Sequence, residues 1–108
     1  MTRNVEETEE AEGDALRAFK WYLDNALTEQ AALRFRDELE DCYQRIGEAP
    51  ERYPIYRRDA RRALLHSYPY GVIYRIASDR IIVVAVMHLR QRPGYGTTRR
   101  HRSRRPQR

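Results

Sequence analysis

Residues 68–93 read YPYGVIYRIASDRIIVVAVMHLRQRP, and this stretch decides the fold of the chain. It contains two runs of β-branched and aromatic residues, Tyr70–Ala77 and Ile81–Met87, separated by the short polar break Ser78-Asp79. Such runs on both sides of a tight polar turn predict a β-hairpin. Because the second run is apolar on both faces, we expect it to be a central strand that is covered on at least one side.

Two amphipathic segments precede this hairpin. In the first, apolar residues recur with a helical period and predict a helix that ends between Asn25 and Leu27. Its expected buried face consists of Leu16, Phe19, Tyr22, Leu23, Ala26 and Leu27. For the second helix the sequence predicts an N-cap at Thr28 and a C-cap at Gly47. Its narrow apolar seam consists of Ala32, Phe35, Leu39, Cys42 and Ile46. Two such helices form an antiparallel hairpin whose apolar faces must pack on the sheet.

The rest of the chain completes an α+β architecture. Residues 1–5 predict a weak first strand, residues 50–54 a rigid connection with two prolines, and residues 63–66 a further strand. The predicted order is (β)ααβββ, a two-helix antiparallel hairpin on one face of a small, mainly antiparallel sheet. We expect a single domain over residues 1–95 and an arginine-rich flexible tail over residues 96–108.

The charge distribution along the chain is asymmetric. Residues 1–51 hold 14 Asp and Glu against 6 Lys and Arg, a net charge of −8, whereas residues 52–108 hold 2 against 15, a net charge of +13. A basic C-terminal half favours contact with a polyanion or an acidic partner, although two halves of opposite sign can also attract each other within one fold. Arginine supplies 20 of the 21 cations, which suits bidentate contacts with phosphate or carboxylate, but can equally reflect genomic base composition.

Several classes of protein find no support in the sequence. The longest apolar run has seven residues, too short to span a membrane, and the acidic N-terminus is not a secretory signal. The single cysteine, Cys42, cannot form an internal disulfide and fits a cytoplasmic location. No cofactor or metal is expected, because the three histidines are scattered and no glycine-rich phosphate loop is present.

Five motifs follow one another along residues 11–95. They are Ala32-x-x-Phe35-x-x-Glu38-Leu39-Glu40, Pro50-Glu51-Arg52-Tyr53-Pro54, Arg61-Arg62-Ala63-Leu64, Tyr68-Pro69-Tyr70-Gly71-Val72-Ile73-Tyr74-Arg75 and the run from Ile82 to Pro93. In this order they resemble the RelE/ParE toxins of bacterial type II toxin–antitoxin modules. Two departures stand out: the first strand is weak, and Gly96 occupies a position where similar toxins often carry tryptophan.

The resemblance implies two alternative activities, and fold alone does not choose between them. ParE-like members inhibit DNA gyrase, whereas RelE-like members are ribosome-dependent mRNA endoribonucleases. Gyrase is the expected target, because efficient RelE-type catalytic sets include lysines and Lys20 is the only lysine here. A non-toxic nucleic-acid-binding relative is a third alternative. The resemblance also implies a co-encoded antitoxin with an acidic C-terminal segment, bound in a heterotetramer or larger complex.

The candidate site residues follow the strands. Metal-independent RNA cleavage needs a base or acid, for which His88 is the candidate, and cations around the phosphate, for which Arg61 and Arg90 are the candidates. The alternative interpretation of His88 is a strand-end histidine bonded to the backbone. Contacts with the target or a nucleic acid are expected at Arg58, Arg62, Arg92 and Tyr95. Six arginines among the last ten residues predict weak, salt-dependent polyanion binding, or no role at all.

Overall fold

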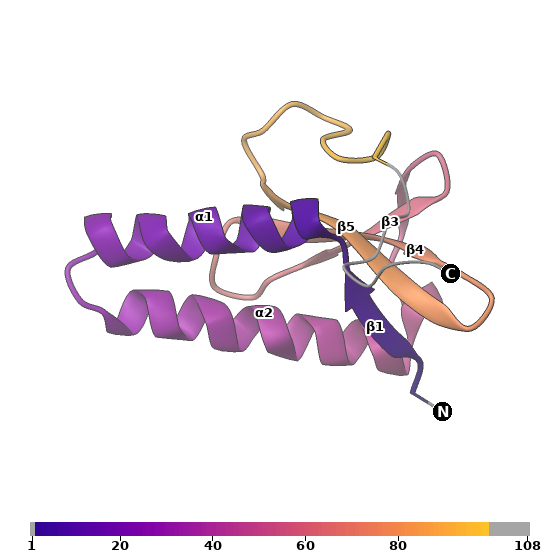
Figure 1. The fold of residues 1–108 in the computed structure, drawn as a ribbon, viewed down its shortest axis with the longest axis horizontal. Helices are drawn as coiled ribbons and strands as arrows, with labels where there is room; N and C mark the ends of the chain where they lie inside the picture. The colour runs from indigo at the N-terminus through magenta and orange to yellow at the C-terminus, as the bar shows by residue number, and fades with distance from the viewer. Residues whose placement is uncertain (1, 100–108) are drawn as a thin grey trace.

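The computed structural model describes residues 2–99 of the chain (Figure 1). Its elements are β1 (Asn4–Glu7), α1 (Glu9–Asn25), α2 (Gln30–Glu48), the short 3-10 helix η1 (Pro50–Arg52), β2 (Ile55–Arg57), β3 (Ala60–Leu64), β4 (Tyr70–Ile76) and β5 (Arg80–His88). The strands form one sheet in the order β1-β5-β4-β3-β2, in which β1 pairs with β5 in parallel and all other pairs are antiparallel. The predicted α+β fold and element order are confirmed, with β2 as an additional short strand.

The predicted hairpin forms the centre of the sheet. β4 pairs with β5 along its whole length, from Tyr70 opposite His88 to Ile76 opposite Ile81. Each residue from Ile81 to Met87 is at most 2% exposed, which confirms the expected central strand. One extra residue in β5, Val84, interrupts the register, and such a bulge increases the local twist of the strand.

Each face of the sheet packs a separate apolar cluster. On the helical face, α1 and α2 (side by side in Figure 1) cover residues that include Val72, Tyr74, Val83 and Val86. All five seam residues predicted for α2 are buried there. On the opposite face, a second cluster contains Ala60, Ile73, Ile82, Val84, Ala85 and Met87, with Tyr56 and Tyr95 packed against it. The sheet is therefore covered on both sides, by two helices on one side and by side chains that include Tyr56 of β2 and Tyr95 of the loop after β5 on the other.

The predicted buried face of α1 is partly wrong. Leu16, Leu23 and Leu27 are exposed, Leu27 fully so, whereas Phe19 and Tyr22 do pack against the core. The residues of α1 that are buried are instead Ala11, Asp14 and Ala18. Small side chains on this stripe let α1 approach β5 closely, and this close packing turns the leucines outward.

The ends of both helices depend on contacts that the sequence pattern does not reveal. Thr8 caps α1, since its Oγ1 accepts a hydrogen bond from the Ala11 N–H at 3.1 Å. The predicted caps of α2 are wrong: the helix begins at Gln30, and Gly47 lies inside its last turn. A Cβ on Gly47 would lie 3.0 Å from the carbonyl oxygen of Arg3, so this glycine allows the chain before β1 to cross α2 closely.

Cys42 is fully buried, and burial raises the pKa of its thiol from 9.0 to about 11. The folded state therefore holds the thiol proton more tightly than the unfolded state, so this contribution to stability is present below pH 9 and is lost as the pH rises through about 11. We expect the free energy of unfolding, measured by urea denaturation under reducing conditions, to fall more steeply above pH 9 for the parent chain than for Cys42→Ala. Equal slopes for the two proteins in this range would contradict the assignment.

Candidate functional site

Beyond the end of β1, side chains take the place of a neighbouring strand and bond to the backbone along the edge of β5. β1 pairs only with Arg80 to Val83, so the backbone of the following residues of β5 lies beyond the last strand on that side. The Val86 N–H donates to Oδ2 of Asp14 at 3.0 Å, and the Val84 carbonyl accepts from Nη1 of Arg99 at 2.9 Å. These two side chains satisfy backbone groups that an open strand edge would leave unpaired.

Asp14 is a buried carboxylate at the centre of this arrangement, with a side chain only 2% exposed. Its Oδ1 accepts from the Tyr95 hydroxyl at 2.9 Å and from Arg17 at 2.6 Å, and its Oδ2 also accepts from Arg99 at 2.8 Å. Burial alone would lower the pKa of Arg99, but the hydrogen bond and charge of Asp14 outweigh it and raise that pKa above its ordinary value. A buried, charge-assisted cluster of this kind holds its members in fixed positions.

Asp14 is not among the predicted site residues. The available signal was a carboxylate between alanines at helical spacing, Ala11, Ala15 and Ala18, on a helix whose leucines were expected to face the core. A short acidic side chain within a stripe of small residues is a candidate buried polar group.

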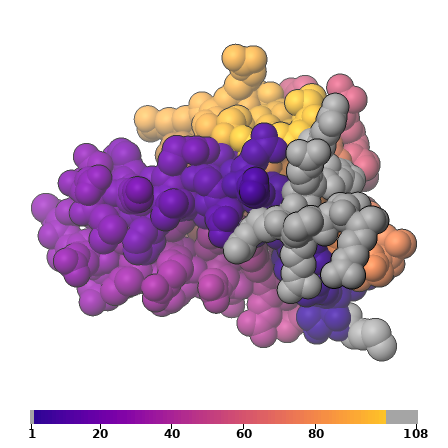
Figure 2. Space-filling view, in the orientation of Figure 1, coloured from indigo at the N-terminus to yellow at the C-terminus, as the bar shows by residue number. Residues whose placement is uncertain are grey.

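The segment after β5, residues 94–99, packs against α1 and the sheet; we refer to it as the C-terminal segment. Figure 2 shows it (yellow) directly against the start of α1 (indigo). Thr97 is 3% exposed, and the Gly94 N–H donates to the Tyr56 hydroxyl at 2.8 Å. The predicted flexible tail began at Gly96; of its first four residues, Thr97 is buried, Gly96 and Arg99 are half-buried and Thr98 is exposed, and residues 100–108 lie outside the described residues. The division into a domain and a tail stays a prediction.

His88 and Tyr95, two of the predicted site residues, line one cavity of about 240 Å³ together with Asp14, Arg17, Ala18, Trp21, Tyr70, Val86 and Gln91. The His88 ring makes an edge-to-face contact with Tyr70, with centroids 5.0 Å apart. Its Nδ1 accepts a hydrogen bond from the Arg90 N–H at 3.0 Å, so the neutral ring carries its proton on Nε2. In neutral His88 the lone pair that a general base needs is therefore engaged with the backbone N–H of Arg90.

Arg61 lies apart from this cavity. Its Nη1 donates to the carbonyl oxygens of Tyr53 at 2.6 Å and Glu51 at 3.3 Å, so the guanidinium anchors the loop after α2. Arg61 stands opposite Tyr74 of β4, whereas His88 stands opposite Tyr70. This offset corresponds to about 13 Å along the strand. Of the three residues proposed for RNA cleavage, His88 and Arg90 are therefore neighbours, whereas Arg61 is not brought to them.

The remaining predicted residues form two groups. Arg58 and Arg62 lie on the β2–β3 hairpin, where the Arg62 guanidinium sits over the Tyr56 ring at 4.4 Å from its centroid. Arg90 and Arg92 are exposed in the turns that follow β5. Within residues 2–99, no group of His, Cys, Asp and Glu is arranged to hold a metal ion, and no helix is long and apolar enough to cross a membrane.

Comparisons with known proteins identify the family. A model of the ParE toxin of type II toxin–antitoxin systems (parDE) matches residues 5–93. The chain is also similar to a solved structure of the chromosomal ParDE system from P. aeruginosa, with a TM-score of 0.71 and 13% identity over 81% of this chain and 96% of that chain. This likeness, at such low identity, supports the fold alone. No curated protein matches the sequence. Because the family model spans most of its length, the chain belongs to the ParE toxin family of type II toxin–antitoxin systems.

Proposed function

We propose that this chain inhibits growth by binding DNA gyrase, and that it does so without cleaving RNA. The family match over residues 5–93 carries this proposal. The positions of the candidate catalytic residues support it, because Nδ1 of His88 is engaged by the backbone and the guanidinium of Arg61 is engaged by a loop. A nuclease would need these groups close together and free to reach a phosphate.

The proposed gyrase contact includes the exposed arginines at the end of β5. Arg90 and Arg92 are exposed shortly after β5, and the backbone N–H of Arg90 is held by Nδ1 of His88 at the end of that strand. We also assign to the proposed contact Arg58 and Arg62 on the β2–β3 hairpin and Tyr95 at the cavity. Guanidinium groups of this kind suit an acidic protein surface and raise the rate of association with it.

We further infer that the partner is a co-encoded antitoxin with an acidic C-terminal segment. Leu16 and Leu23 are exposed on the outward face of α1, and Leu27 is exposed in the loop that follows, so these leucines offer apolar surface to an amphipathic helix. The basic C-terminal half would attract the acidic part of the same partner. We expect the product of a short adjacent gene to co-purify with this chain as a heterotetramer or larger complex, measured by light scattering. A monomeric chain that binds no neighbouring gene product would contradict this inference.

The gyrase proposal is tested with purified gyrase and with cells. We expect the parent chain to inhibit plasmid supercoiling and the double variant Arg90→Ala/Arg92→Ala to need about tenfold more protein for the same inhibition. The matched control is Arg34→Ala/Arg36→Ala, which removes the same charge from exposed positions on α2. The amount of this control variant needed to inhibit supercoiling should differ from that of the parent chain by less than about twofold.

The two alternative functions give different results in the same cells. After induced expression, RNA ends and DNA breaks are mapped in parallel. Codon-positioned mRNA ends that disappear in His88→Ala would establish the endoribonuclease and reject gyrase binding. The shared cavity of His88 and Tyr95 is the observation that keeps this alternative under test. An absence of any growth defect would indicate a non-toxic nucleic-acid-binding relative.

A further inference from the structure

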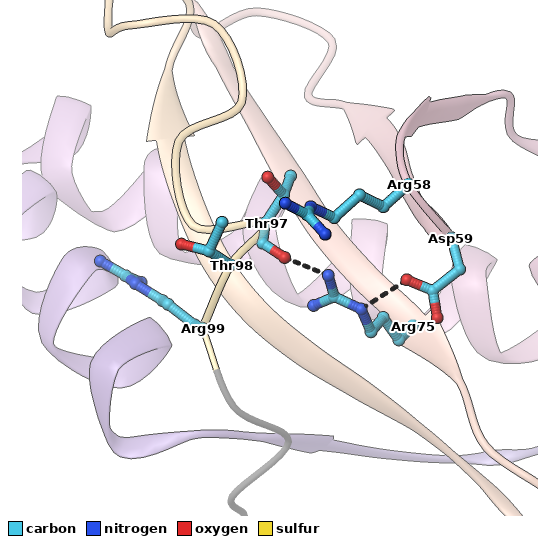
Figure 3. Close-up of a pocket in the computed structure, with 6 residues that line it drawn as sticks. All are labelled: Arg58, Asp59, Arg75, Thr97, Thr98 and Arg99. Carbon is cyan, nitrogen blue, oxygen red and sulfur yellow. Dashed lines mark hydrogen bonds and ion pairs between the residues drawn. The ribbon is translucent and has the colours of Figure 1, made fainter.

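A second basic site lies on the sheet face opposite the helices. It is a hollow of about 560 Å³ lined by Arg58, Asp59, Arg75, Thr97, Thr98 and Arg99 (Figure 3). These residues come from the β2–β3 turn, from β4 and from the C-terminal segment. None of them lines the cavity that contains His88 and Tyr95. The hollow and that cavity are therefore two different depressions, which are connected through Arg99, because Arg99 bonds to Asp14 and Tyr95 of the cavity.

Arg75 is the central group of this hollow and is only 5% exposed. Its Nε donates to Oδ1 of Asp59 at 2.7 Å, and its Nη2 donates to the carbonyl oxygen of Thr97, as the dashed lines in Figure 3 show. Its Nη1 is also buried and has no hydrogen-bond partner among the described residues. An arginine keeps its charge at every accessible pH, and a buried donor of this kind is destabilising unless an acceptor reaches it. Nη1 of Arg75 can therefore donate a hydrogen bond to one further oxygen, and that bond would stabilise it.

Arg58 supplies a second cation to the same hollow. It occupies the β2–β3 turn with a φ of 52°, and in Figure 3 its side chain extends across the hollow toward Thr97. The guanidinium of Arg99 points away from the hollow and is engaged by Asp14. Asp59 is the one carboxylate of the lining, and it already accepts from Nε of Arg75. The side chains that line the hollow consequently carry a net positive charge, and the guanidinium groups of Arg58 and Arg75 both supply donors to it.

We propose that this hollow binds a phosphate group between Nη1 of Arg75 and the guanidinium of Arg58. Thr98 also lines the hollow, but in Figure 3 its hydroxyl points away from the two guanidinium groups. Donors that approach from separate elements suit the tetrahedral oxygens of phosphate better than the flat carboxylate, which one arginine fork satisfies. The exposed Arg58 side chain moves to admit the ion and then closes over it. The source is either a nucleic-acid backbone or free phosphate, and the inference holds whether or not gyrase is the target.

The test uses the full chain and inorganic phosphate, compared with chloride at constant ionic strength. Phosphate is expected to shift the side-chain NMR signals of Arg75 and to raise the melting temperature. Asn fits a positive φ, so Arg58→Asn removes the charge without straining the turn, and it should weaken phosphate binding about tenfold. The control is Arg57→Asn, which removes the same charge from an exposed neighbour outside the lining and should change binding less than about twofold.

A second arm identifies the source of the phosphate. A short single-stranded oligodeoxynucleotide is titrated by fluorescence anisotropy against the parent chain and both variants. If Arg58→Asn alone weakens binding, the site takes a backbone phosphate; if neither variant does, it takes free phosphate only. Equal losses in the two variants would show a diffuse basic surface and overturn the proposal. Unshifted Arg75 signals would also overturn it, as would acetate that competes as well as phosphate, because that result describes a site for an acidic peptide.

Discussion

Replacing Asp14 with alanine is expected to lower the free energy of unfolding by about 3–5 kcal/mol, the range for removing one partner of a buried ion pair. The carboxylate accepts from two arginines, a tyrosine hydroxyl and the Val86 N–H. Its loss leaves Arg99 without its buried counter-charge and opens the edge of β5 beyond β1. The effect is measured by urea denaturation at neutral pH, with the slope of the transition as a check that the folded state stays compact.

The control for this prediction is a carboxylate with a similar local pairing but without burial. Asp41 pairs with Arg45 one helical turn away at 3.0 Å, and its side chain is 57% exposed. Asp41→Ala should cost less than about 0.5 kcal/mol. In a double-mutant cycle, Asp14→Ala and Arg99→Gln are expected to couple by about 1–3 kcal/mol. If Asp14→Ala cost no more than Asp41→Ala, the carboxylate would not hold the C-terminal segment in place.

The parts of the fold that were predicted correctly are those where side-chain size and polarity agree with position. Residues 81–87 are β-branched, alanine or methionine throughout. A run that is apolar on both faces and rich in β-branched residues indicates a buried strand. The seam of α2 was predicted for the same reason, because all its members are buried and four of them, Phe35, Leu39, Cys42 and Ile46, belong to the core cluster on the helical face of the sheet. In α1 the hydrophobicity pattern favoured Leu16 and Leu23, whereas the close approach to β5 required Ala11 and Ala18.

The candidate site was harder to predict because its contacts are made by backbone atoms in loops. The sequence placed His88 at a strand end, but its tautomer depends on the Arg90 N–H, which a turn brings back onto the ring. Arg61 was expected near a phosphate, but the path of the loop after η1 brings the Tyr53 carbonyl to it first. Such contacts follow from where a loop runs, and residue type alone does not determine that path.

Gly96→Ala is expected to displace the C-terminal segment and to lower the free energy of unfolding by about 2–4 kcal/mol. Gly96 has a φ of 79°, and a Cβ at this position would lie 2.4 Å from the Cβ of Ala85. Ala85 is fully buried in β5 and cannot move aside without disturbing the sheet. The tryptophan that similar toxins often carry here is therefore incompatible with this packing. Once displaced, the segment loses the contacts of Tyr95 and Arg99 with Asp14.

Gly94→Ala is the control for Gly96→Ala, because it shares the backbone strain of an alanine at positive φ but not the steric clash with Ala85. Gly94 also has a positive φ, 85°, but its Cβ would meet the Arg57 side chain at Cδ, which is flexible and free to move. It should therefore cost about 1–2 kcal/mol, less than Gly96→Ala. Hydrogen exchange gives the local readout: in Gly96→Ala the amides of Thr97 and Arg99, which bond within the segment, should exchange faster while those of β4 and β5 remain protected. Equal costs for the two substitutions would mean that φ alone decides and that the contact with Ala85 does not anchor the segment.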